Sequence, residues 1–220
     1  MMPDLFDLED LSAGVAETVR RIAIAGFHAL WDGSTPTLCE LNGGDGGAAL
    51  DEAVAHLQAR GRIEVAPDGR LLAVHGLSRR PTRHRIEHRG GVSNVPLQGL
   101  SGGSVNTWCA LDAIGIPAAL GIDARAVTTC PSCNRELIVT LASGSAVPLV
   151  GVVLWYPEAA DAWEHLVDQF CSGANLFCNL DHLQDRMGTE GAGGAIMTVE
   201  EVAEIGREAW ADVSTTGKSR

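Results

Sequence analysis

The sequence predicts an α+β fold, with an N-terminal winged-helix-like three-helix domain followed by a mixed α/β domain with mainly antiparallel strands. Two observations predict the first domain: three helical patterns follow one another before residue 61, and a hairpin pattern comes directly after them. A third observation predicts the second domain, because strand and helix patterns are mixed from residue 106 onward. We place the domains at 1–80 and 81–213 and expect a disordered tail at 214–220.

The first helix is predicted at residues 12–31, where apolar residues recur at helical spacing and Ser12 can cap the N-terminus. A short second helix starts at 37–41 and ends at the glycines that follow. The third helix is predicted at 51–60, with a glycine after it as a C-terminal cap. Residues 63–74 contain two short apolar runs on either side of a Pro-Asp-Gly turn, which predicts the hairpin.

A winged-helix pattern raises the question of DNA binding through its third helix. Residues 51–60 begin with Asp51 and Glu52 and carry only one arginine. A helix that enters the major groove usually presents basic and amide groups to phosphates and base edges. We therefore interpret the first domain as a structural or partner-docking unit.

Two segments of unusual composition lie between the predicted domains. Residues 79–85 form the one basic run, which we interpret as a solvated strand edge or, alternatively, as a docking site for an acidic partner. His84 and His88 are interpreted as surface residues in a strand-like stretch. Residues 90–103 contain five glycines and are predicted to be a loop.

The second domain contains both types of element. The final helix opens with the capping-box pattern Thr198-Val199-Glu200-Glu201. We predict the other helices at 106–116, at about 158–168 and from Asn179 onward, extended chain at 170–178, and strands at 124–129, 135–141, 149–155 and 195–197.

Composition excludes several classes of function. The formal net charge is −12, from 16 basic and 28 acidic residues, and this opposes binding to nucleic acid or to an anionic membrane surface. No apolar run approaches the roughly 20 residues of a membrane span. The acidic start, residues 1–7, lacks the basic and apolar regions of a signal peptide, so we expect a cytoplasmic protein. In that compartment, six cysteines are expected to be thiols, metal ligands or core residues.

The segment Trp108-Cys109-Ala110-Leu111-Asp112 is the strongest candidate for chemistry. On a helix, Cys109 and Asp112 are three residues apart and face the same way. A position in the first turn would lower the pKa of the Cys109 thiol, and burial beside a like charge would raise the pKa of Asp112. The alternative is a core thiol next to an acid that is paired with a backbone amide or an arginine. Cys171 alone would also be interpreted as a core residue.

The motif Cys130-Pro131-Ser132-Cys133 is a C-x-x-C knuckle between two predicted strands. A structural zinc site needs a second such pair, or two histidines at short spacing. His165 and His182 are too far apart to supply that pair, so we interpret the motif as a knuckle turn. A redox role is also weakly supported, because the βαβ context of such motifs is missing.

Several segments taken together resemble the bacterial organomercurial (alkylmercury) lyases. The most specific is Asn106-Thr107-Trp108-Cys109-Ala110-Leu111-Asp112-Ala113, and Cys171 follows in the same order. The resemblance also covers, in chain order, residues 116–120, 126–130, 157–161, 169–171 and 194–201. It spans roughly residues 105–212, so that 81–213 becomes an organomercurial-lyase-like catalytic domain.

This resemblance implies protonolysis of the carbon–mercury bond of R–Hg⁺ to R–H and Hg²⁺. The family's two cysteines and one aspartate match Cys109, Cys171 and Asp112, as mercury-binding thiolates and proton shuttle. Thiolates are the ligands that soft cations prefer. No cofactor is implied, because mercury is substrate and product. External small thiols or a mercuric reductase are implied as acceptors of the product ion.

Some residues depart from the family pattern. The insertion at 90–103 lies just before the catalytic segment, and Ser172 stands where some members have a further thiol adjacent to the one matched by Cys171. Cys130 matches a third family cysteine that looks structural, whereas Cys133 and Cys178 look additional, so the C-x-x-C could itself hold mercury or zinc. Two other functions stay open: a thiol-based metal-binding or metal-sensing protein without turnover, and a zinc-knuckle structural protein without chemistry.

Overall fold

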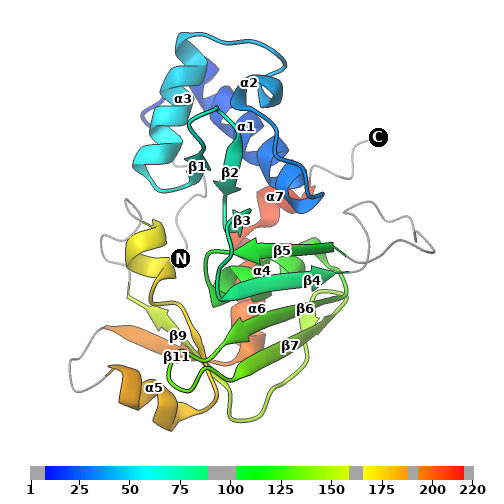
Figure 1. Ribbon diagram of the computed structural model, residues 1–220, viewed down its shortest axis with the longest axis vertical. Helices are drawn as coiled ribbons and strands as arrows, with labels where there is room; N and C mark the ends of the chain where they lie inside the picture. The colour runs from blue at the N-terminus through cyan, green and yellow to red at the C-terminus, as the bar shows by residue number, and fades with distance from the viewer. Residues whose placement is uncertain (1–7, 89–102, 159–165, 188–192, 216–220) are drawn as a thin grey trace.

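The computed structural model describes residues 8–88, 103–158, 166–187 and 193–215 (Figure 1). Most of the predicted glycine-rich loop at 90–103 lies outside these residues, as do most of the predicted helix at 158–168 and residues 216–220 of the predicted tail. The last described helix, α7, spans Ala211–Thr215.

The first part of the chain folds as three helices and a hairpin. These elements are α1 (Ala13–Trp31), α2 (Leu38–Leu41), α3 (Ala48–Ala59), β1 (Ile63–Val65) and β2 (Leu71–Val74). The Ser12 hydroxyl accepts a hydrogen bond from the Val15 N–H at 3.4 Å, as expected for an N-terminal cap. The predicted elements are therefore present, while the winged-helix assignment and the boundary near residue 80 stay predictions.

The main sheet has eight antiparallel strands in the order β1-β2-β3-β5-β4-β6-β7-β8. Leu77 of β3 pairs with Thr107 of β5, so the sheet runs without a break from the hairpin into the second half of the chain. The strands beyond the hairpin are β3 (Leu77–Ser78), β4 (His84–His88), β5 (Gly103–Thr107), β6 (Ala124–Thr129), β7 (Glu136–Ala142) and β8 (Ser145–Ala146). The prediction of mainly antiparallel strands is thereby confirmed.

A second, three-stranded antiparallel sheet has the order β10-β9-β11. Its strands are β9 (Val153–Pro157), β10 (Leu176–Phe177) and β11 (Gly194–Met197). The remaining helices are α4 (Ala110–Leu120), α5 (Leu180–Met187) and α6 (Val199–Ala209), and a wide π-type helical turn covers Leu166–Cys171. The α+β class is therefore confirmed.

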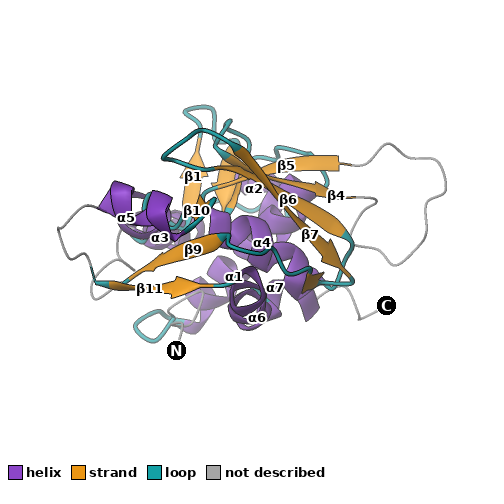
Figure 2. Ribbon diagram, turned by 90° about the horizontal axis from the view of Figure 1, so that it is seen from below, coloured by secondary structure: helices purple, strands orange, loops and turns teal. Residues whose placement is uncertain are grey.

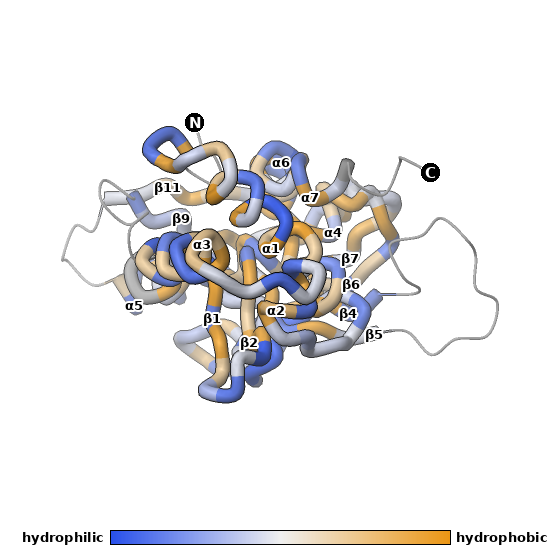
Figure 3. Tube along the Cα trace, turned by 90° about the horizontal axis from the view of Figure 1, so that it is seen from above, coloured by the Kyte–Doolittle hydropathy of each residue, from blue (hydrophilic) through white to orange (hydrophobic). Residues whose placement is uncertain are grey.

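Helix α4 occupies the centre of the molecule, between the main sheet and α6 (Figure 2). The two helices approach backbone to backbone, since a Cβ added at Gly206 would lie 2.1 Å from the Cα of Gly115. Trp210 closes the end of this contact, and its indole N–H donates to the His75 carbonyl at 3.0 Å. Hydrophobic stretches of the trace gather where α1, α4 and the strands meet (Figure 3). This packing holds α4 rigidly in the core.

Several predicted boundaries were wrong, and the local pairing explains why. The helix expected at 106–116 begins only at Ala110, because residues 103–107 pair with their neighbours as β5. The strand expected at 149–155 lies at Val153–Pro157. The stretch expected to be extended at 170–178 instead contains the end of the π-type turn and the short strand β10.

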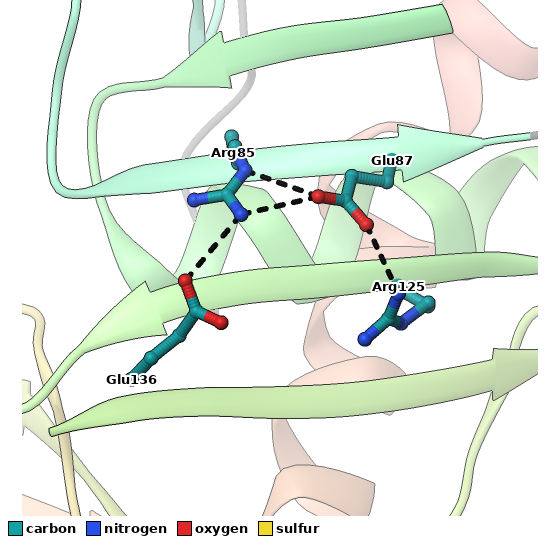
Figure 4. Close-up of polar contacts among 4 residues, drawn as sticks. All are labelled: Arg85, Glu87, Arg125 and Glu136. Carbon is teal, nitrogen blue, oxygen red and sulfur yellow. Dashed lines mark hydrogen bonds and ion pairs between the residues drawn. The ribbon is translucent and has the colours of Figure 1, made fainter. Parts of the chain in front are cut away.

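The end of the basic run, His84 and Arg85, does not lie at a sheet edge, because β4 pairs with β5 on one side and β6 on the other. Arg85 of this strand contacts Glu87 at 3.1 Å and Glu136 at 3.4 Å, and Arg125 contacts Glu87 at 3.3 Å (Figure 4). These side chains are partly exposed, so each pair contributes at most about 1 kcal/mol to stability. Part of the predicted basic surface is therefore neutralised within the sheet.

The other face of β4 is buried. His84 and His88 point inward, against the expectation of surface residues, because burial alternates along the strand. The Nδ1 atom of His84 lies 2.6 Å from the Thr128 hydroxyl, and the ring of His88 stacks on Trp31 with the centroids 4.2 Å apart. Within the described residues, no helix combines the length and apolar character needed to cross a membrane.

Candidate active site

Cys109 is the N-cap residue of α4, directly before its first residue, and its backbone is extended, with φ −146° and ψ 177°. The Asp112 carboxylate turns back over the helix end and accepts a hydrogen bond from the Cys109 N–H at 2.9 Å. This is a capping box with cysteine in the place usually taken by serine or threonine. The same bond that starts the helix therefore holds an acid beside the thiol.

The turn between β2 and β3 fixes the other side of Asp112. His75 has φ 44° and Gly76 has φ 92°, which is the pattern of a two-residue hairpin turn with two left-handed residues. A Cβ at Gly76 would lie 2.8 Å from the Asp112 Oδ1 atom. The Gly76 carbonyl accepts from the Trp108 N–H at 2.9 Å. Only glycine allows this close approach of backbone to carboxylate.

Cys171 reaches the site from the end of the π-type turn. The Ala110 N–H, in the first turn of α4, donates to the Ala174 carbonyl at 3.1 Å, which docks the chain after Cys171 on the helix N-terminus. The preceding residue, Phe170, is buried against Tyr156 with the ring centroids 5.1 Å apart. Cys171 is thus brought from 62 positions along the chain to face Cys109.

The ligand atoms of Cys109, Asp112 and Cys171 all lie within 4.8 Å of one another. All three side chains are buried. The two thiols also hydrogen-bond to each other. Cys171, and not Cys133 or Cys178, is therefore the thiol that faces Cys109.

Burial controls the protonation of this trio. Loss of solvent raises the pKa of Asp112 to about 7, against the lowering effect of hydrogen bonds from Cys109 and Trp108 and of the Arg62 charge. Burial also raises the pKa of the Cys109 thiol well above its usual value, so the expected lowering by the helix N-terminus was wrong.

The pKa of the Cys171 thiol is also raised. Its hydrogen bond with Cys109 lowers the pKa of Cys171, but burial and the nearby Asp112 charge outweigh this effect, and the pKa is raised. Near neutral pH the site therefore holds two thiols and an acid that can both accept and release a proton. Such a trio can exchange thiol protons for a soft cation and return a proton to a substrate atom.

A pocket of about 440 Å³ leads to this site. Cys171 is part of its wall, together with Trp108, Phe177 and Arg186, whereas Cys109 and Asp112 are not. A ligand that enters through the pocket would therefore meet Cys171 first, and Cys109 lies behind it.

Two of the residues that shape the site were not anticipated from the sequence. Gly76 lies just after the predicted hairpin, and Arg62 is a single arginine just before it whose buried charge lowers the pKa of Asp112 and Cys171. The two additional cysteines lie elsewhere: Cys133 and Cys178 form a separate group with Cys130.

Comparison with known proteins decides the family. The family model described as alkylmercury lyase matches residues 77–211 of the 220-residue chain, which is more than half of its length. The chain belongs to the alkylmercury lyase family. The matched region contains Cys109, Asp112 and Cys171. The expectation of an enzyme of this kind is thereby confirmed.

Individual relatives agree with this assignment. An alkylmercury lyase of Staphylococcus epidermidis is 24% identical over 174 residues, covering 78% of this chain and 73% of that protein. An alkylmercury lyase of Bacillus cereus is 24% identical over 169 residues, covering 73% and 68%. A crystal structure of the mercury-bound form of MerB2 has the same fold, with a TM-score of 0.75, 22% identity and coverage of 94% and 95% of the two chains.

Proposed function

We propose that this protein is an organomercurial lyase that cleaves the carbon–mercury bond of R–Hg⁺ at Cys109, Cys171 and Asp112. One observation carries the proposal: in a member of the alkylmercury lyase family, two thiols and one carboxylate converge within 4.8 Å in a buried site. Two sulfur ligands suit a soft cation, and an acid with a pKa of about 7 suits proton transfer near neutral pH.

The first step is exchange of a thiol proton for mercury. R–Hg⁺ enters through the pocket and meets Cys171, whose S–H bond breaks as the S–Hg bond forms. The Asp112 carboxylate receives the proton that is released. Cys109 then adds its sulfur to the same mercury and also loses its proton, so that two thiolates donate electron density through mercury to carbon.

The second step is protonolysis. The protonated Asp112 delivers its proton to the carbon as the C–Hg bond breaks, and the bonding electron pair becomes the new C–H bond. The balance is R–Hg⁺ plus two thiols giving R–H, Hg²⁺ held by two thiolates, and one proton released to solvent. No redox change is required: one thiol proton reaches carbon through Asp112, and the other leaves to solvent.

The product must then leave a buried pair of thiolates. Small thiols, or the thiols of a mercuric reductase, would compete for Hg²⁺ by ligand exchange, and protons would return to Cys109 and Cys171. None of the six cysteines of the chain forms a disulfide, which suits a reducing, cytoplasmic setting. In that setting the reaction would serve detoxification and mercury resistance.

The test is release of hydrocarbon. Phenylmercury incubated with the protein and excess thiol should give benzene above the background of thiol alone, measured by gas chromatography. Cys109→Ala and Cys171→Ala should each reduce release to background, while Cys39→Ser should not, because Cys39 is exposed on α2 away from the site. No benzene above background from the folded wild-type protein would refute the proposal.

A further inference from the structure

A second cluster of metal-ligand side chains lies outside the candidate active site. The Sγ atoms of Cys130, Cys133 and Cys178 and a ring nitrogen of His182 all lie within 4.8 Å of one another. None of these residues takes part in the chemistry proposed for the mercury site. Three sulfurs and one imidazole nitrogen form one of the common donor sets of structural zinc sites.

The distances between the donors fit one small ion at their centre. The Sγ atoms of Cys133 and Cys178 are 3.5 Å apart, and the Cys130 Sγ is 3.6 Å from the His182 Nδ1 atom. A tetrahedral site with Zn–S of about 2.3 Å and Zn–N of about 2.0 Å has edges of roughly 3.8 Å between sulfurs and 3.6 Å between sulfur and nitrogen. The observed separations are close to these edges without any rearrangement of the chain.

The backbone supports the first half of the cluster as a knuckle between β6 and β7. The Asn134 N–H donates to the Cys130 carbonyl at 2.9 Å, and Asn134 has φ 59°. The Cys130 N–H in turn donates to the Arg135 carbonyl at 2.9 Å. This tight turn brings both sulfurs of the C-x-x-C motif to one side.

The second half of the cluster comes from the start of α5. Cys178 and His182 are separated by three residues, and the His182 N–H donates to the Asn179 Oδ1 atom at 2.8 Å, which fixes the first turn of the helix. The Ser132 hydroxyl donates to the His182 carbonyl at 2.6 Å and joins the two halves directly. The knuckle and the helix are therefore joined by this hydrogen bond as well as by the contacts between their donor atoms.

We propose that Cys130, Cys133, Cys178 and His182 form a tetrahedral structural zinc site. All four positions of the ion are filled by protein groups, which is the arrangement of structural rather than catalytic zinc. Imidazole as one donor, with three thiolates, suits zinc among the ions available to a reducing compartment. This inference does not depend on the proposed lyase activity.

The location of the cluster indicates what a bound zinc ion would stabilise. Cys178 lies seven residues after Cys171, and strand β10 connects them. A zinc ion would therefore fasten the segment that carries the second mercury-binding thiol to the turn between β6 and β7. The same pocket that reaches Cys171 is lined by Pro131 of the knuckle and by Arg186 of α5, so the site also supports one wall of the entrance.

The test begins with the metal content of the full-length protein, purified without added metal or chelator from a mercury-free culture. Wild type and Cys39→Ser should each carry about one zinc per chain, and Cys133→Ser and His182→Ala should carry on the order of a tenth of that. Cys39→Ser is the matched control, because it removes an exposed thiol outside the cluster. Stripping zinc from the wild type should lower its Tm by roughly 10 °C.

A spectroscopic measurement keeps the proposal testable if a variant does not fold. Stripped wild-type protein titrated with Co²⁺ should develop thiolate-to-metal charge-transfer bands and the intense visible bands of tetrahedral cobalt. The proposal is overturned if the purified protein holds no zinc and Co²⁺ gives only the weak bands of an octahedral, oxygen-bound ion. It is equally overturned if the cluster takes up Hg²⁺ but never zinc, which would make it a transit site for the product.

Discussion

Replacing Asp112 by asparagine should stabilise the protein at neutral and alkaline pH while removing its proton shuttle. The carboxyl pKa is raised from 3.8 to about 7 in the folded protein. A group whose pKa is raised on folding favours the folded state when protonated. Its contribution is fully present below about pH 4 and is lost as the pH rises through about 7. Each unit of difference between the folded and unfolded pKa corresponds to about 1.4 kcal/mol. The charged carboxylate therefore costs about 4 kcal/mol of stability at pH 8.

Asparagine has nearly the same shape and keeps an oxygen to accept from the Cys109 N–H, so it removes the buried charge without opening a cavity. Urea unfolding at several pH values measures the effect. The free energy of unfolding of Asp112→Asn should exceed that of the wild type by about 4 kcal/mol at pH 8. The difference should fall to about 2 kcal/mol at pH 5.5, because the wild-type acid is then mostly protonated. Asp51→Asn, at an exposed position of α3, should change stability by no more than about 0.5 kcal/mol.

The same variant should lose turnover. A positioned proton donor typically contributes 10²- to 10⁴-fold to rate, so hydrocarbon release should fall by about that factor while mercury still binds to the two thiols. Equal or lower stability of Asp112→Asn at pH 8 would refute the reasoning, since it would mean that the carboxylate is not desolvated. Undiminished release would refute the role of Asp112 as shuttle.

Two further predictions concern the contacts that position the site. Gly76→Ala places a methyl group 2.8 Å from the Asp112 Oδ1 atom. It should reduce hydrocarbon release at least about tenfold at saturating phenylmercury. The control is Gly69→Ala, at φ 81° but with no atom near its Cβ, which should carry a similar backbone strain of about 1 kcal/mol and retain activity. Equal losses in the two variants would contradict the Gly76 argument. Gly206→Ala should destabilise the protein by about 3 kcal/mol in urea unfolding, because its Cβ would lie 2.1 Å from the Cα of Gly115, and unchanged stability would contradict the close α4–α6 contact.

Much of the fold followed from local patterns. The Ser12 cap, the capping box at Thr198 and the strand pattern at 124–129 each depend on residues close in sequence, and each element appears where it was expected. The start of α4 was misplaced for a specific reason. Cysteine is not an ordinary N-cap residue, and it takes that role here because Asp112 completes the capping box. Pairing of 103–107 as β5 depends on strands elsewhere in the chain.

The geometry of the site could likewise be predicted only where it depends on residues close in sequence. The spacing of Cys109 and Asp112 pointed to one face of one helix, but nothing local indicated that Gly76 would close over the carboxylate. The position of Cys171 opposite Cys109 could be inferred only from resemblance to a family, because tertiary contacts bring the two thiols together. The raised pKa of Cys109 could not be predicted from a helix-end position alone, since burial outweighs the effect of the helix.

The second cluster was within reach of the sequence but was missed. From the sequence, the C-x-x-C motif was expected to need a pair of histidines, whereas the structure brings it together with Cys178 and His182, a C-x-x-x-H spacing. In the structure His182 lies in the first turn of α5, and Cys178 comes two residues before that helix begins. A cysteine and a histidine four positions apart are common by chance, so the spacing gains meaning only when the fold brings it to the knuckle.

The central claim is that Cys109, Cys171 and Asp112 cleave the carbon–mercury bond by delivering a solvent-exchangeable proton to carbon. Turnover of phenylmercury in D₂O with excess thiol, followed by mass spectrometry of the released hydrocarbon, tests it most directly. The wild-type protein should release benzene carrying one deuterium, and Cys109→Ala and Cys171→Ala should release none above background. Unlabelled benzene, or equal release from either variant, would contradict it.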